Sequence, residues 1–120
     1  MKVNYTSFLD NEKQFNLLNG IYPIEQDSSS RWIWTAQNFG GTIDNIEYIT
    51  FSLISNIKNQ LIYDDKIIDI DKDCLYIIKV ITKNKTHFNF SLKTSYEDNN
   101  DQRLLGIMLV GIKVEEDVIF

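Results

Sequence analysis

The chain is poor in residues that form disulfides or bind metal ions. Its 120 residues include one cysteine, one histidine and one proline. Cys74 cannot form a disulfide within the chain, and without a second cysteine it lacks the partner that a zinc pair requires. We expect it to serve as a small buried apolar residue. The sequence therefore excludes a disulfide framework and gives no reason to expect a zinc site.

Long apolar runs are also missing. No stretch approaches the roughly 18 apolar residues that a membrane span needs, and residues 1–6 show no apolar core of a signal peptide. We therefore predict a cytoplasmic protein with no membrane span.

Positive charge is in deficit, with 12 Lys and Arg against 17 Asp and Glu and a net charge of -5. Binding to phosphate backbones requires a clustered basic surface. We therefore expect no nucleic acid partner and no anionic membrane surface as partner.

The composition is that of a folded β-protein. Hydrophobic residues make up 43% of the chain and charged residues 24%, which is close to the globular norm. The sequence contains 18 Ile and 12 Asn, so β-branched residues and turn-forming amides outnumber strong helix formers such as Ala. A chain of this length has room for one domain. We predict a single all-β domain over residues 1–120.

Alternating apolar residues separated by polar turns predict about eight short strands. The expected strands are residues 20–25, 31–36, 46–54, 61–63, 67–70, 75–82, 87–92 and 104–114. Residues 1–19 are a lead-in segment, predicted as a strand or a short helical turn. Gly40 and Gly41 are predicted to form a turn, and residues 96–102 a loop. Because residues 104–114 are apolar at nearly every position, we expect a central strand there. Even spacing favours an antiparallel sandwich or jelly roll.

Two motifs carry a family resemblance. Residues 20–25 (Gly-Ile-Tyr-Pro-Ile-Glu), a short polar loop and Arg31-Trp32 form the first, and residues 101–107 (Asp-Gln-Arg-Leu-Leu-Gly-Ile) form the second. In this order, the pair resembles the opening and closing motifs of β-sandwich accessory domains found with bacterial glycosyltransferases and other polysaccharide-assembly enzymes. The resemblance covers residues 20–115.

The resemblance implies a jelly-roll fold related to carbohydrate-binding modules. It also implies a role beside glycan synthesis, with a glycan or a glycan-lipid intermediate as ligand and a glycosyltransferase or other glycan-modifying enzyme as partner. Since the sequence holds no catalytic domain of that kind, the enzyme would be a separate protein or lie outside this sequence.

Trp32 and Trp34 are candidates for a sugar platform, because a flat indole face stacks on a pyranose ring. In a strand they share one face with Ala36, and that face is either a binding surface or the core. Since the Trp of Arg-Trp looks structural in the resembling domains, we favour Trp32 in the core. For Trp34 the core and the platform both stay open, and we keep it as the candidate binding residue.

Charged and aromatic residues of the two motifs are further candidates. Tyr22 and Glu25 lie one short loop from Arg31, and Asp101 and Arg103 form a second compact pair. An Arg with a carboxylate either clamps sugar hydroxyls or pins a loop by bidentate hydrogen bonds. We favour loop pinning, and the clamp is the alternative. His87 joins the candidate binding residues because alternation places it opposite Phe88 and Phe90, on a polar face.

Five aspartates lie within ten residues, at positions 64, 65, 69, 71 and 73. They are not an EF-hand, because Cys74 and Val80 occupy the places where that loop requires Gly and Glu. A solvated acidic turn is the favoured interpretation and a structural calcium ion the alternative. We predict no metal site and no cofactor.

The sequence offers no Cys-His pair, no nucleophilic serine motif and no glycine-rich phosphate loop. Two carboxylates alone suffice for a glycosidase, so a small hydrolase is the enzymatic alternative. We predict a noncatalytic carbohydrate-binding or accessory module. The alternative is a structural, protein-docking module that recruits or oligomerises a glycan-modifying enzyme without binding sugar.

Overall fold

The computed structural model describes residues 5–10, 13–98 and 101–120, and the side chains of residues 13–97 and 103–120. These residues form thirteen strands and no helix. The strands are β1 (Tyr5–Asp10), β2 (Lys13–Ile21), β3 (Glu25–Gln26), β4 (Arg31–Asp44), β5 (Tyr48–Ile54), β6 (Asn59–Tyr63), β7 (Lys66–Ile70), β8 (Leu75–Ile81), β9 (His87–Leu92), β10 (Tyr96–Asp98), β11 (Asp101–Leu105), β12 (Met108–Val114) and β13 (Asp117–Val118). The all-β prediction is confirmed, with thirteen strands among the described residues instead of the expected eight.

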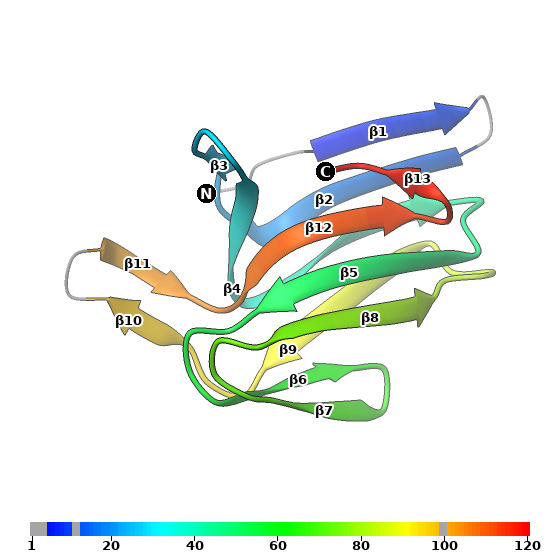
Figure 1. The fold of residues 1–120 in the computed structure, drawn as a ribbon. Helices are drawn as coiled ribbons and strands as arrows, with labels where there is room; N and C mark the ends of the chain where they lie inside the picture. Colours follow the sequence, from blue (N-terminus) through cyan, green and yellow to red (C-terminus); the bar gives the residue numbers. More distant parts are fainter. Residues whose placement is uncertain (1–4, 11–12, 99–100) are drawn as a thin grey trace.

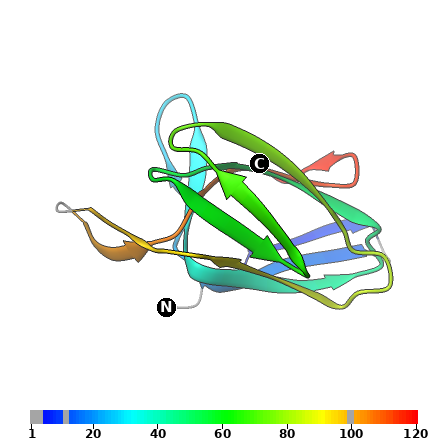
Figure 2. The same ribbon diagram turned by 90° about the horizontal axis from the view of Figure 1, so that it is seen from below.

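Antiparallel pairing joins most strands into one curved sheet in the order β7-β6-β9-β4-β12-β5-β8. Strands β2 and β3 pair with β4, β1 pairs with β2, and β13 pairs with β12, whereas β10 and β11 form a separate hairpin. The sheet curls until β7 and β8 approach each other, which gives a nearly closed, barrel-like shape (Figures 1 and 2).

Strand β4 connects the two sides of this curved sheet. Near its start Trp34 pairs with Met108 of β12, and near its end Thr42 pairs with His87 of β9. Between these ends the strand is fastened to the segment before β12. The Thr35 backbone N–H donates to the Ile107 carbonyl at 2.9 Å, and the Gly106 N–H donates to the Thr35 carbonyl at 2.6 Å. One long strand therefore contributes to both walls of the core.

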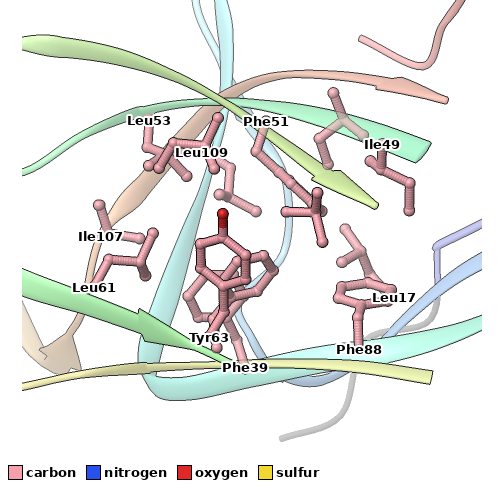
Figure 3. Close-up of a cluster of buried hydrophobic side chains, with 14 of the residues drawn as sticks. Leu17, Phe39, Ile49, Phe51, Leu53, Leu61, Tyr63, Phe88, Ile107 and Leu109 are labelled. Atoms are coloured by element: carbon pink, nitrogen blue, oxygen red, sulfur yellow. The ribbon is translucent and has the colours of Figure 1, made fainter. Parts of the chain in front are cut away.

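The core fills the space inside the curl. Its largest fully buried side chains include Phe15, Phe39, Phe51 and Phe90. Figure 3 shows the labelled Phe39 and Tyr63 rings between aliphatic residues of opposite walls. Phe39 and Phe90 stack with their ring centroids 5.0 Å apart, and Phe51 meets Phe90 edge-on at 5.2 Å. Such aromatic pairs stabilise a core beyond the area that they bury.

Gly40 and Gly41 do not form the predicted turn. Both lie within β4, where Gly41 pairs with Phe88 on one side and Leu17 on the other. A Cβ atom on Gly41 would lie 1.8 Å from the Asn16 carbonyl oxygen. The glycine therefore permits a close approach of two backbones. Glycine is used for such approaches as well as for turns.

Cys74, which we expected to be buried, is exposed. Three other expectations change. The lead-in segment supplies strands β1 and β2, while residues 1–4 and 11–12 lie outside the described residues. The predicted loop at 96–102 holds the β10–β11 hairpin around residues 99–100, which are likewise not described. The last strand is interrupted at Gly106 and Ile107, although β12 is central as expected, between β4 and β5. The described residues include no helix long and apolar enough to cross a membrane.

Candidate ligand-binding cleft

An open cleft of about 840 Å³ lies where the β3–β4 hairpin separates from β12. We call it the Trp32 cleft. Its wall is built by the loop after β3, the start of β4, the end of β5, the start of β12 and the C-terminal residue. The lining residues are Gln26, Asp27, Ser28, Ser29, Ser30, Arg31, Trp32, Ile54, Met108, Val110 and Phe120. Its volume lies within the range typical of small-ligand sites.

The loop on the polar side is organised by Asp27. Its Oδ1 atom accepts hydrogen bonds from the backbone N–H groups of Ser29 and Ser30, both at 2.8 Å, and from the hydroxyls of the same two serines. These donors, the backbone groups first, hold the pKa of the Asp27 carboxyl below its usual value. The backbone N–H of Asp27 closes the turn by donating to the Ser30 carbonyl at 3.0 Å.

Trp32 faces the cleft because its neighbour Ile33 faces the core. Ile33 is 1% exposed and Thr35 is fully buried, so alternation turns Trp32 outward. The Trp32 side chain is half-buried, and Cα pairing with Glu25 holds its backbone in the β3–β4 hairpin. An indole thus lies beside apolar side chains of β5 and β12.

Arg31 supplies the cation of the cleft. Its side chain is exposed, and the guanidinium forms no hydrogen bond or ion pair with other described residues. The serine hydrogen bonds all go to Oδ1 of Asp27, and Asp27 makes no ion pair with Arg31, so the donors of Arg31 remain available for a ligand. The cleft therefore combines an aromatic face with a free fork of donors.

Trp34, kept from the sequence as the candidate binding residue, is only 9% exposed and does not line the cleft. Trp32, which we expected in the core, is not a member of the core cluster. The two tryptophans share the outward face as predicted, but the one that we expected in the core is the more exposed. The sequence does not reveal this because burial depends on which segments cover that face.

The two family-like motifs meet in space. The Arg103 guanidinium lies 3.2 Å from the Glu25 carboxylate and stacks over the Tyr22 ring, with its central carbon 5.0 Å from the ring centroid. The Tyr22 hydroxyl donates to the Leu104 carbonyl at 3.0 Å. These contacts favour loop pinning over a sugar clamp for Tyr22, Glu25 and Arg103. The Asp101 side chain lies outside the described residues.

His87 is remote from the cleft. It is exposed on β9, opposite Thr42 near the far end of β4, and its Nδ1 lies 3.1 Å from the Thr86 hydroxyl. It lines a separate surface depression with Asp64 and Lys85, whose side chains form an ion pair at 2.7 Å.

The aspartates of residues 64–73 do not gather. Asp64 pairs with Lys85, and Asp69 accepts a hydrogen bond from the Gln60 amide at 2.9 Å. Within the described part of the chain, no three His, Cys, Asp or Glu side chains are grouped as a metal site.

Sequence reasoning missed the apolar side of the cleft. Ile54 ends a strand face that otherwise carries Tyr48, Thr50 and Ser52, so an apolar residue in a polar series was a readable signal. No such signal marked Phe120, because only the return of the chain after β13 brings it to β12, where the Ile112 N–H donates to its carbonyl at 3.2 Å.

Comparisons with protein-family models, with curated proteins and with solved structures find no match to this chain.

Proposed function

We propose that the chain is a noncatalytic carbohydrate-binding module, of the jelly-roll type associated with polysaccharide-assembly enzymes, and that it binds a saccharide in the Trp32 cleft. The observation that carries this proposal is a half-buried indole beside an unpaired guanidinium in an open cleft. An indole stacks on the apolar face of a pyranose, while nearby donors bond its hydroxyls. This chemistry requires no nucleophile and no metal.

Each part of the cleft has a role in this proposal. Trp32 supplies the stacking face. Arg31 donates to ring oxygens or hydroxyls, and the Gln26 amide and the Ser28 hydroxyl lie on the same polar side. Met108 and Val110 form the apolar floor on which the far side of the sugar packs. The Asp27 turn holds this side of the cleft in a fixed conformation.

A glycan array of the purified chain tests the proposal, with Trp32→Ala as the decisive variant. We expect at least one glycan to bind and this binding to be lost in Trp32→Ala. The matched control is Tyr96→Ala, because Tyr96 is also a half-buried aromatic residue but does not line the cleft. Binding that survives Trp32→Ala, or a folded protein that binds no glycan at millimolar concentration, would contradict the proposal.

One observation favours the alternative, a protein-docking module. Strand β8 exposes three large apolar side chains, with Leu75 57%, Ile77 68% and Ile81 57% exposed. Exposed apolar groups collected on one surface often mark contact with a partner. A chain that binds no glycan but associates through β8 would support docking.

A further inference from the structure

The apolar floor of the Trp32 cleft continues beyond the cleft along the outer face of the sheet. Met108 of β12 is the cross-strand partner of Ile54 of β5, and Ile54 is the partner of Leu75 of β8. Directly opposed residues of antiparallel strands point to the same face. Three apolar side chains therefore form a row across three neighbouring strands.

Ile77 adds a fourth apolar side chain next to this row, along β8. It lies two residues beyond Leu75 on the same face of β8, opposite Ser52 of β5. We call Met108, Ile54, Leu75 and Ile77 the apolar strip. With neighbouring strands about 4.8 Å apart, its row from Met108 to Leu75 spans about 10 Å. Met108 and Ile54 belong to both the cleft and the strip, so the two surfaces are continuous.

Exposure increases along the strip with distance from the cleft. Met108 and Ile54 are half-buried, whereas Leu75 is 57% and Ile77 68% exposed. Leu75 and Ile77 are therefore large apolar side chains that stand open to solvent directly beside the cleft. Their position is explained if the ligand carries an apolar portion that leaves the cleft over the strip.

We propose that the ligand is an amphiphilic glycan, a saccharide joined to a hydrocarbon chain. The saccharide occupies the Trp32 cleft, and the hydrocarbon chain lies over Ile54, Leu75 and Ile77. This inference rests on the proposed function, because it requires a sugar in the cleft. It adds the substrate class, since the apolar side chains of the strip offer a hydrocarbon chain a matching surface and offer the hydroxyls of a further sugar unit no hydrogen-bond partner.

Methyl, butyl and octyl glycosides of glucose, galactose, mannose and N-acetylglucosamine are suitable probes, used below their critical micelle concentrations. Affinity is measured by NMR titration of the full chain. We expect octyl glycosides to bind more tightly than methyl glycosides, by about fourfold for each methylene that reaches the strip. Shifts are expected at both the Trp32 indole and the Ile77 methyl groups.

In the variant Leu75→Ser/Ile77→Ser, affinity should no longer increase with the length of the alkyl chain, while the affinity for methyl glycosides should be unchanged. The matched control is Ile67→Ser, since Ile67 is 63% exposed on β7, outside the strip. In that control, affinity should still increase with the length of the alkyl chain. Because all three residues are exposed, the substitutions should leave the fold intact, which far-ultraviolet circular dichroism checks.

Other outcomes separate this inference from the proposed function. If methyl glycosides bind at Trp32 and octyl glycosides bind no more tightly, the inference is overturned and the proposed function stands. Octyl glycosides that shift Ile77 but not Trp32 would overturn both. Sedimentation at rising protein concentration provides the remaining check, because a dimer that the double serine variant dissociates would assign the strip to a second copy of the chain.

Discussion

At the scale of single residues, the two tryptophans differ in burial and therefore in role. They are two positions apart on the same strand face, yet Trp34 is 9% exposed and Trp32 lines a cleft. The same residue type therefore contributes to stability at one position and is available to a ligand at the other.

Replacing Trp34 with Ala should lower the free energy of unfolding by about 3 to 5 kcal/mol, because it empties a buried site. Trp32→Ala should cost clearly less, since its side chain is half-buried. Urea unfolding followed by circular dichroism measures both. Equal losses for the two variants would contradict the assignment of Trp32 to the cleft.

The Asp27 turn makes a prediction about pH. Hydrogen bonds to the ionised carboxylate lower the pKa of Asp27 in the folded state. The turn is therefore stabilised above the pKa of an ordinary Asp, and this stabilisation is lost as the pH falls through the lowered folded pKa. The amide NMR signals of Ser29 and Ser30 should titrate with a midpoint below that of Asp in a model peptide. A midpoint at or above that value would show that the turn does not form as described.

At the scale of elements, the junction of β4 with the segment before β12 determines where the cleft opens. Thr35 is fully buried there, and its hydroxyl accepts a hydrogen bond from the Ile107 N–H at 3.0 Å while donating to the Ala36 carbonyl at 2.9 Å. Backbone hydrogen bonds to Ile107 and Gly106 reinforce the junction. The hairpin that carries Trp32 is thus anchored at its base.

Thr35→Val should destabilise the fold by about 1 to 3 kcal/mol, because it leaves the buried Ile107 N–H without its acceptor. Thr50→Val is the matched control, since Thr50 is half-buried on the outer face of β5. Chemical denaturation of both variants checks the prediction. If Thr35→Val were as stable as Thr50→Val, the junction would not depend on this hydroxyl.

The ion pair between Glu25 and Arg103 joins the β3–β4 hairpin to the β10–β11 hairpin. Because both side chains are about one-third exposed, a double-mutant cycle with Glu25→Gln and Arg103→Met should give a coupling of no more than about 1 kcal/mol, decreasing with salt. Loop pinning predicts that Glu25→Gln leaves glycan affinity nearly unchanged. A large loss of affinity with no change in stability would instead favour the sugar clamp.

At the scale of the whole molecule, the sequence predicts the all-β class of the fold but not the curling of the sheet into a nearly closed barrel-like shape. Alternation and composition predict antiparallel strands, because they report local backbone preference and one-sided burial. They misplace the Gly40-Gly41 segment, since close packing against Asn16 is a contact between distant parts of the chain. They also do not show that β4 belongs to both walls.

The candidate site shows the same limit. Arg31 and the serine loop are visible as a polar segment beside a strand, but the cleft exists only where Met108, Val110 and Phe120 come to face them. The meeting of Glu25 with Arg103, 78 residues apart, likewise requires the complete topology. Local patterns predict which residues are available, and the fold determines which of them meet.

The most direct test of saccharide binding at the Trp32 cleft is a nitrogen–proton NMR titration of the two tryptophan indole signals, assigned with Trp32→Phe. With a glycan identified on the array, binding in the Trp32 cleft predicts a saturable shift of the Trp32 indole signal while that of Trp34 stays in place. A shift confined to Trp34, or a bound glycan that moves neither signal, would contradict it.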